Sequence, residues 1–326
     1  DLYIMDSASD GPRRLVAGQG QAIVDPRFSP DGRWVAYVQD SELHVVAVEG
    51  GEPRRVTFGA RESGRSNGLA EYVAQEEMNR YRGYWWSPDG KQLAFVEVDE
   101  RHIPIYRIVH QGKATIGPGA QEDHCYPFAG RENTRVRLGV VPLSGGEPVW
   151  MDLGADPDIY LARVRWLPGG WLVAQVVNRS QSQLDLLRFD PASGRSHLLL
   201  RESNDTWINL HDLFKPLNEN DRPYSGGFIW GSERDGYMHL YLYDGDGRLI
   251  RPLTRGEWLV TGLAAVDQEK ELLYFTATLD SPLENHLYVT SFSGGSPRRI
   301  TTQPGMHSVT VDHGRQRFVD VHHALD

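Results

Sequence analysis

The chain carries at residues 28–38 the stretch Phe28-Ser29-Pro30-Asp31-Gly32-Arg33-Trp34-Val35-Ala36-Tyr37-Val38. A second copy stands at residues 86–96, Trp86-Ser87-Pro88-Asp89-Gly90-Lys91-Gln92-Leu93-Ala94-Phe95-Val96. Pro-Asp-Gly supplies turn chemistry, since proline fixes φ and glycine tolerates the left-handed region. Apolar, β-branched and aromatic residues flank the turn, so each copy predicts a β-hairpin. A looser third copy occupies residues 166–173.

A second marker recurs beside these hairpins, a turn followed by Pro-Arg-Arg and an aliphatic residue. It stands at Pro12-Arg13-Arg14-Leu15, Pro53-Arg54-Arg55-Val56 and Pro297-Arg298-Arg299-Ile300, with a weaker copy at Pro148-Val149. The copies are spaced by one, two and three units of roughly 40–50 residues, the length of a propeller blade. The repeat therefore predicts an all-β protein, a β-propeller of four-stranded blades.

Residues 1–326 are interpreted as one propeller domain of about six blades and a fraction. Both chain ends fall inside the repeat pattern, so the ring is expected to be incomplete here, with about seven to eight blades in the parent protein. An array of β-sandwiches is the rival architecture, but sandwiches do not repeat one hairpin signature at this interval.

Composition excludes several classes of function. The formal net charge of −10 argues against a nucleic-acid partner, because phosphate binding needs a basic face. No stretch approaches the roughly 20 apolar residues that span a bilayer. Cys125 is the single cysteine, so no internal disulfide forms. The histidines lack the paired spacing of a zinc site, and no metal or cofactor is predicted.

The largest break in the repeat is an insert at residues 59–84. A polar loop at 61–68 precedes a predicted helix at 69–80, where good helix formers stand without glycine or proline. Gly64-Arg65-Ser66-Asn67-Gly68 matches the G-x-S-x-G pattern, but a nucleophile elbow needs a buried strand before the serine and a helix directly after it. Ser66 is therefore interpreted as a loop residue.

The insert also contains two adjacent acids, Glu76 and Glu77. Neighbouring side chains on a helix point about 100° apart, and an arbitrary Glu-Glu pair is usually a solvated helix face. Such a pair becomes useful when a cation lies between the two carboxylates.

The surrounding segment is Gln75-Glu76-Glu77-Met78-Asn79-Arg80-Tyr81-Arg82-Gly83-Tyr84-Trp85-Trp86-Ser87-Pro88. It resembles the double-glutamate segment of dipeptidyl peptidase IV enzymes, in the prolyl oligopeptidase family, and is particularly similar to dipeptidyl peptidases 8 and 9. Four further segments resemble the family in the same order, at residues 126–133, 207–214, 228–236 and 253–258.

The resemblance implies a serine dipeptidyl aminopeptidase that removes N-terminal dipeptides of the X-Pro or X-Ala type. Glu76 and Glu77 would bind the substrate's N-terminal ammonium, and the propeller would gate substrate access. The catalytic Ser-Asp-His triad belongs to a C-terminal α/β-hydrolase domain that is expected to be absent here, so no catalytic residue is assigned and the segment alone is expected to be inactive. A carbonyl-binding arginine is expected upstream of Asp1.

The resemblance further suggests His211 and Asp212 as a wall of the substrate entrance. It implies as partners peptides with a free N-terminus and the protein's own hydrolase domain, and it allows a homodimer of the parent. Two other functions are open: a stand-alone propeller for protein interaction, and an independent propeller hydrolase that uses its own carboxylates or Ser66. A bacterial parent is expected from the short loops, with a periplasmic location favoured over a cytoplasmic one.

Overall fold

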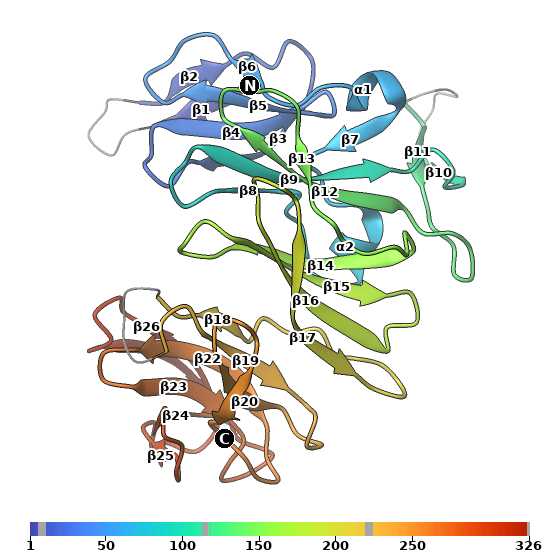
Figure 1. Cartoon of the computed structure of the whole chain (residues 1–326). Helices are drawn as coiled ribbons and strands as arrows, with labels where there is room; N and C mark the ends of the chain where they lie inside the picture. Colours follow the sequence, from blue (N-terminus) through green and yellow to red (C-terminus); the bar gives the residue numbers. More distant parts are fainter. Residues whose placement is uncertain (6–10, 113–116, 118, 219–223, 325–326) are drawn as a thin grey trace. The chain divides into compact units, whose positions relative to one another are not determined.

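The computed structural model describes residues 1–5, 11–112, 117, 119–218 and 224–324, and most of its regular structure is antiparallel β-sheet (Figure 1). The chain divides into two compact units, residues 1–198 with 203–207 and residues 199–202 with 208–326. Each unit has its own hydrophobic core of β-branched, leucine and aromatic side chains. Among the described residues, no helix has the length and apolar character needed to cross a membrane.

The first four-stranded sheet has the order β3 (Ile23–Phe28), β4 (Trp34–Gln39), β5 (Glu42–Ala47), β6 (Arg54–Arg55). The predicted turn joins β3 to β4. The Ser29 hydroxyl donates to the Asp31 carboxylate at 2.5 Å and accepts the Trp34 amide at 3.0 Å. Gly32 has a φ of 70°, which favours glycine. These contacts span five residues at most, and so the turn is specified locally.

The second Ser-Pro-Asp-Gly turn repeats this geometry. Ser87 donates to Asp89 at 2.7 Å and accepts the amide of Gln92 at 2.9 Å. The turn joins β8 (Tyr84–Trp86) to β9 (Gln92–Asp99), which pair antiparallel. The looser third copy joins β14 (Ile159–Trp166) to β15 (Leu172–Asn178). All three predicted hairpins are confirmed.

The remaining sheets follow the chain in order. The sheet that contains β9 has the order β13 (Val149–Trp150), β12 (Arg135–Pro142), β9, β7 (Arg65–Asn67), and β8 also pairs with β9. The next has the order β14, β15, β16 (Gln183–Phe189), β17 (Ser196–Ser203). Two-stranded sheets form from β1 (Leu2–Ile4) with β2 (Arg13–Val16), and from β10 (Ile105–Val109) with β11 (Gln121–Cys125).

Further along the chain lie two more four-stranded sheets. One has the order β18 (Phe214–Pro216), β19 (Phe228–Ser232), β20 (His239–Tyr243), β21 (Leu249–Pro252). The other has the order β22 (Val260–Asp267), β23 (Leu272–Ala277), β24 (His286–Ser291), β25 (Arg298–Arg299). The last pair is β26 (Met306–Val311) with β27 (Phe318–His323). Consecutive four-stranded antiparallel sheets are the blades that the repeat predicts.

The Pro-Arg-Arg marker proves to be the start of a blade's last strand. Its arginines form β6 and β25 and begin β2, and the weaker copy begins β13. A threonine follows in the β6 and β25 copies and at the equivalent place after β21. The hydroxyl oxygens of these threonines accept hydrogen bonds from leucine backbone amides. The pairs are Leu43 to Thr57 at 2.9 Å, Leu240 to Thr254 at 2.9 Å and Leu287 to Thr301 at 3.1 Å. The marker thus fixes the register of the outer strand.

The insert departs from its prediction. In place of a polar loop at 61–68, the structure has a one-turn helix α1 (Ala60–Ser63) and strand β7, which pairs with β9. The predicted helix at 69–80 shortens to α2 (Tyr72–Glu76). It ends because Asn79 takes a left-handed φ of 54° and the Arg80 amide donates to the Ala74 carbonyl at 2.8 Å. Asparagine tolerates that conformation better than most residues.

Candidate functional site

The two glutamates stand at the end of α2. Glu76 is the last helical residue and Glu77 is its C-cap, whose amide donates to the Val73 carbonyl at 2.9 Å. Both side chains are exposed, whereas Ala74 and Met78 on the opposite side are buried. Among the described residues, no hydrogen bond or ion pair engages either glutamate carboxylate. The helix therefore presents two unpaired negative charges to solvent.

The ends of the insert meet over strand β9. The Gly68 amide donates to the Val96 carbonyl at 2.9 Å, and the Val96 amide donates to the Gly83 carbonyl at 2.8 Å. A Cβ on Gly83 would lie 2.4 Å from the Gly68 carbonyl carbon. Real Cβ atoms essentially never approach backbone so closely, and so glycine is required at this crossing. The segment carrying Glu76 and Glu77 is a closed loop standing on β9.

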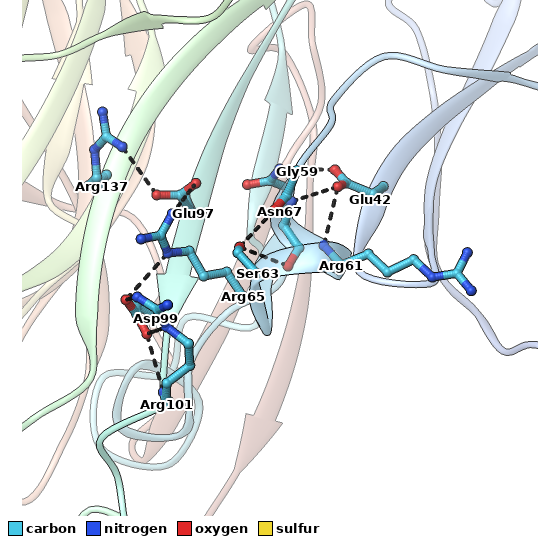
Figure 2. Close-up of polar contacts among 11 residues, drawn as sticks. Glu42, Gly59, Arg61, Ser63, Arg65, Asn67, Glu97, Asp99, Arg101 and Arg137 are labelled. Atoms are coloured by element: carbon cyan, nitrogen blue, oxygen red, sulfur yellow. Dashed lines mark hydrogen bonds and ion pairs between the residues drawn. The ribbon is translucent and has the colours of Figure 1, made fainter.

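A buried acid, Glu42 of β5, holds the first part of the insert (Figure 2). Its carboxylate accepts hydrogen bonds from the Thr57 hydroxyl at 2.7 Å, the Ala60 amide at 2.8 Å and the Asn67 side-chain amide at 3.0 Å. A carboxylate can accept several such bonds, and burial without them would be costly. Glu42 therefore joins the first blade to both α1 and β7.

Sequence reasoning missed Glu42, although the repeat register contains a signal. In the later blades the same place before the threonine-paired leucine is taken by His239 and His286, whose Nδ1 atoms lie 3.0 Å from the threonine hydroxyls. Only in the blade next to the insert does a glutamate stand there, among the three blades that carry this threonine. The glutamate carboxylate offers two acceptor oxygens to the amides of the insert, whereas a neutral histidine ring has one acceptor nitrogen.

Beside Glu42 a row of alternating charges crosses β7, β9 and the adjoining strand (Figure 2). Arg137 of β12 lies 3.3 Å from Glu97, and Arg65 of β7 lies 3.3 Å from Asp99. Arg101 donates to Asp99 at 2.6 Å and holds the pKa of that carboxyl well below its usual value. Most of these groups are partly exposed, so each pair contributes about 0–1 kcal/mol. The row reinforces the pairing of β7 with β9.

Four aromatic rings pack together beside helix α2, which carries the glutamate pair. Tyr72 of α2 lies 5.0 Å from Tyr126, measured between ring centroids, and Tyr126 lies 4.9 Å from Phe128. Tyr106 of β10 lies 6.0 Å from Phe128. A hydrogen bond with Tyr126 raises the pKa of Tyr72, and the carboxylates of Glu76 and Glu77 contribute in the same direction. Within this aromatic cluster, Tyr72 thus lies within electrostatic reach of the two charges.

A partly buried carboxyl, Glu100, directly follows strand β9. Burial raises its pKa, and the charge of Glu71 raises it further. Because the pKa of Glu100 is higher in the folded than in the unfolded protein, its contribution to stability is present at pH values below the unfolded-state pKa and is lost as the pH rises through the folded-state pKa.

We expect Glu100→Gln to raise the Tm at pH 8 relative to the parent protein, with the difference vanishing near pH 4. Thermal unfolding at both pH values measures it, and an unchanged Tm at pH 8 would contradict it.

The other predicted residues are placed as follows. Ser66 lies in β7, after helix α1 and before a non-helical segment, the reverse of the strand-then-helix order that a nucleophile elbow needs. Its interpretation as loop was wrong, because β7 pairs with β9. His211 and Asp212 belong to the second unit, and the His211 ring packs edge-on against Trp230 at 4.8 Å. Their role as an entrance wall stays a prediction.

Comparison with known proteins matches the whole chain, residues 1–326, to the model of the dipeptidyl peptidase IV (DPP IV) N-terminal region. The chain is 29% identical over 91% of its length to dipeptidyl peptidase 8 of Mus musculus, covering 42% of that protein. It is 30% identical over 90% of its length to a probable dipeptidyl peptidase 4 of Aspergillus fumigatus, covering 39% of it.

The crystal structure of Porphyromonas gingivalis dipeptidyl peptidase 4 superposes with a TM-score of 0.81 at 26% identity. The superposition covers 96% of this chain and 42% of the other. With the four-stranded sheets described above, this likeness confirms the predicted propeller fold. The chain spans about two fifths of the length of these relatives.

Proposed function

Since the chain belongs to the family of dipeptidyl peptidase IV N-terminal regions, we propose that it is the non-catalytic propeller of a serine dipeptidyl aminopeptidase. In this proposal Glu76 and Glu77 bind the N-terminal ammonium of a peptide substrate, and the propeller gates access to a hydrolase domain elsewhere in the protein. The carrying observation is the pair of exposed carboxylates at the end of α2, which have no hydrogen-bond or ion-pair partner within the described part of the chain.

The chemistry of the pair suits an ammonium. A free α-amino group has a pKa of about 7.7–8.0 and is largely protonated at neutral pH. Each carboxylate can accept a charge-assisted hydrogen bond from it, worth roughly 1.5–3 kcal/mol. A fixed distance between this anchor and a nucleophile selects the bond after the second residue, so that dipeptides are released.

Replacing either acid by its amide tests the proposal. In the full-length enzyme we expect Glu76→Gln and Glu77→Gln each to lower kcat/KM for glycyl-prolyl p-nitroanilide by roughly 10- to 100-fold, since each removes one charge-assisted hydrogen bond. The matched control is Glu147→Gln, an exposed glutamate in the loop before β13. The 326-residue chain alone should not hydrolyse the amide. Unimpaired amide variants would refute the ammonium site, and turnover by the chain alone would reveal a nucleophile within it.

The pH profile gives an independent check. We expect kcat/KM for the same substrate to fall above about pH 8, because the substrate ammonium then loses its proton. In Glu76→Gln this alkaline decline should flatten, since the lost charge no longer discriminates between ammonium and amine. Initial rates between pH 6 and 10 measure both profiles. An identical alkaline decline in the variant would contradict the assignment.

A further inference from the structure

Within the insert, a buried ion pair joins the two ends of the shorter segment that carries Glu76 and Glu77. Nη2 of Arg80 lies 2.7 Å from Oε2 of Glu71, and each side chain is 4% exposed. Glu71 is the N-cap of α2 but makes no side-chain capping bond, because its carboxylate is turned to Arg80 instead. The pair therefore closes a ring of ten residues, 71–80, around the two exposed glutamates.

Arg80 also ties this ring to its surroundings. Its Nε donates to the Leu161 carbonyl of β14 at 2.9 Å, and its Nη1 donates to the Arg82 carbonyl at 2.7 Å. The guanidinium fork thus fixes three points at once, the start of α2, the chain after the loop and a strand of the next blade. A planar fork with five donors can do this, whereas an ammonium cannot hold the same geometry.

A second arginine, from the strand that contains Leu161, holds the backbone next to the acidic pair. Nη1 of Arg163 in β14 donates to the Met78 carbonyl at 2.7 Å. Met78 directly follows Glu77, so the backbone next to the acidic pair is attached to β14 on one side, while Gly68 and Gly83 attach it to β9 on the other. The five-residue helix α2 is too short to be stable by itself. Its position must come from these attachments.

We propose that Arg80 and Glu71 are positioning residues for ammonium binding, which set the place and direction of the Glu76 and Glu77 carboxylates. This rests on the function proposed above and names two residues that hold the site without contacting the substrate. An error of about 1 Å in the position of a binding group can cost roughly 100-fold in rate. Loss of the Glu71–Arg80 ion pair, here called the clamp, should therefore impair the anchoring of the substrate N-terminus and leave the distant nucleophile intact.

The experiment uses the full-length enzyme with Arg80→Met, Arg80→Lys and Glu71→Gln. The Met side chain matches the length of the arginine stem and removes every donor. Two readouts are compared, kcat/KM for glycyl-prolyl p-nitroanilide and the rate of serine labelling by a fluorophosphonate, which needs no ammonium. The matched control is Arg107→Met, which breaks a pair with Asp123 at 2.6 Å that is solvent-exposed.

We expect Arg80→Met to lower kcat/KM by at least 10-fold, mainly through a raised KM, with fluorophosphonate labelling within 2-fold of the parent enzyme. Arg80→Lys should recover little, and Arg107→Met should change neither readout. In a Glu76→Gln, Glu77→Gln background, Arg80→Met should add less than 3-fold, because the groups it positions are gone. Glu71→Gln keeps an oxygen acceptor for Arg80 and should show a smaller loss of the same kind.

Three results would overturn the proposal: an unchanged kcat/KM in Arg80→Met, an equal loss of amide hydrolysis and fluorophosphonate labelling, or a fully multiplicative effect in the double-glutamine background. Its failure is distinguishable from failure of the proposed function. If Glu76→Gln and Glu77→Gln alone have no effect, the ammonium site itself is wrong. If they are impaired and Arg80→Met is not, only the clamp is wrong. Insoluble Arg80→Met would transfer the test to Glu71→Gln, for which the same three outcomes decide.

Discussion

Glu42→Ala is expected to lower the free energy of unfolding by about 3–5 kcal/mol, because it combines a cavity with lost acceptors. Glu42 is 1% exposed, and its carboxylate accepts hydrogen bonds from Thr57, Ala60 and Asn67. Alanine would leave these donors buried without partners. Urea unfolding followed by tryptophan fluorescence measures the change, since Trp85 and Trp86 lie in β8 of the sheet to which the insert belongs.

The matched control for Glu42→Ala is Glu49→Ala, an exposed glutamate at the end of the same hairpin. Exposed substitutions of this kind stay within about 0.5 kcal/mol. Glu42→Gln should fall between the two, since one amide oxygen still accepts while the amide nitrogen faces other donors. A loss of less than about 1 kcal/mol in Glu42→Ala would show that the insert is held chiefly by β7 and the row of exposed ion pairs.

Gly83→Ala is expected to cost about 3 kcal/mol, the upper end for overpacking at a site that cannot relax. The new Cβ would lie 2.4 Å from backbone atoms of Gly68 and Leu69, and backbone cannot move aside as a flexible side chain can. Gly68 itself has a φ of 87° and its hydrogen bond to Val96 fixes it in place. The clash should open the crossing at the base of the insert and disturb Glu76 and Glu77 as well.

The control is Gly119→Ala, a glycine with an ordinary φ and no atom within 4 Å of its Cβ position. That change should be neutral or slightly stabilising, since alanine lowers the entropy of the unfolded chain. Equal stabilities of the two alanine variants in denaturant would mean that the Gly68–Gly83 crossing is loose. Proteolysis within residues 59–84 gives a second measure, with faster cleavage expected in Gly83→Ala only.

The blades were predictable because their signals are local. Ser29 and Ser87 bind partners two and five residues away, so Ser-Pro-Asp-Gly specifies its hairpin wherever it stands. The Pro-Arg-Arg marker gives the spacing of the blades, and together the two patterns were sufficient for an all-β propeller. The candidate site rests on a different kind of signal, since Glu76 and Glu77 were singled out by their resemblance to a family segment, and their role as a binding site stays a prediction.

The insert was predicted less well because its structure depends on distant partners. Strand β7 looks like a polar loop, since the strand it pairs with, β9, lies some 30 residues later. The helix at 69–80 was too long because propensity favours continuing it, whereas Arg80 is drawn to Glu71 and to Leu161 of β14. Tertiary hydrogen bonds of this kind outweigh helix propensities of a few tenths of a kcal/mol per residue.

By itself, the sequence determined the repeated hairpins, the spacing of the blades and the presence of two adjacent acids in the one long insert. Tertiary structure alone decided where those acids stand: on a five-residue helix closed by Glu71 and Arg80, tied to β14, and rooted on Glu42 and the Gly68–Gly83 crossing. The physical reason is the range of the interactions. Turn hydrogen bonds join residues within one short motif, whereas the charged side chains that hold the segment of Glu76 and Glu77 find their partners up to 85 residues away.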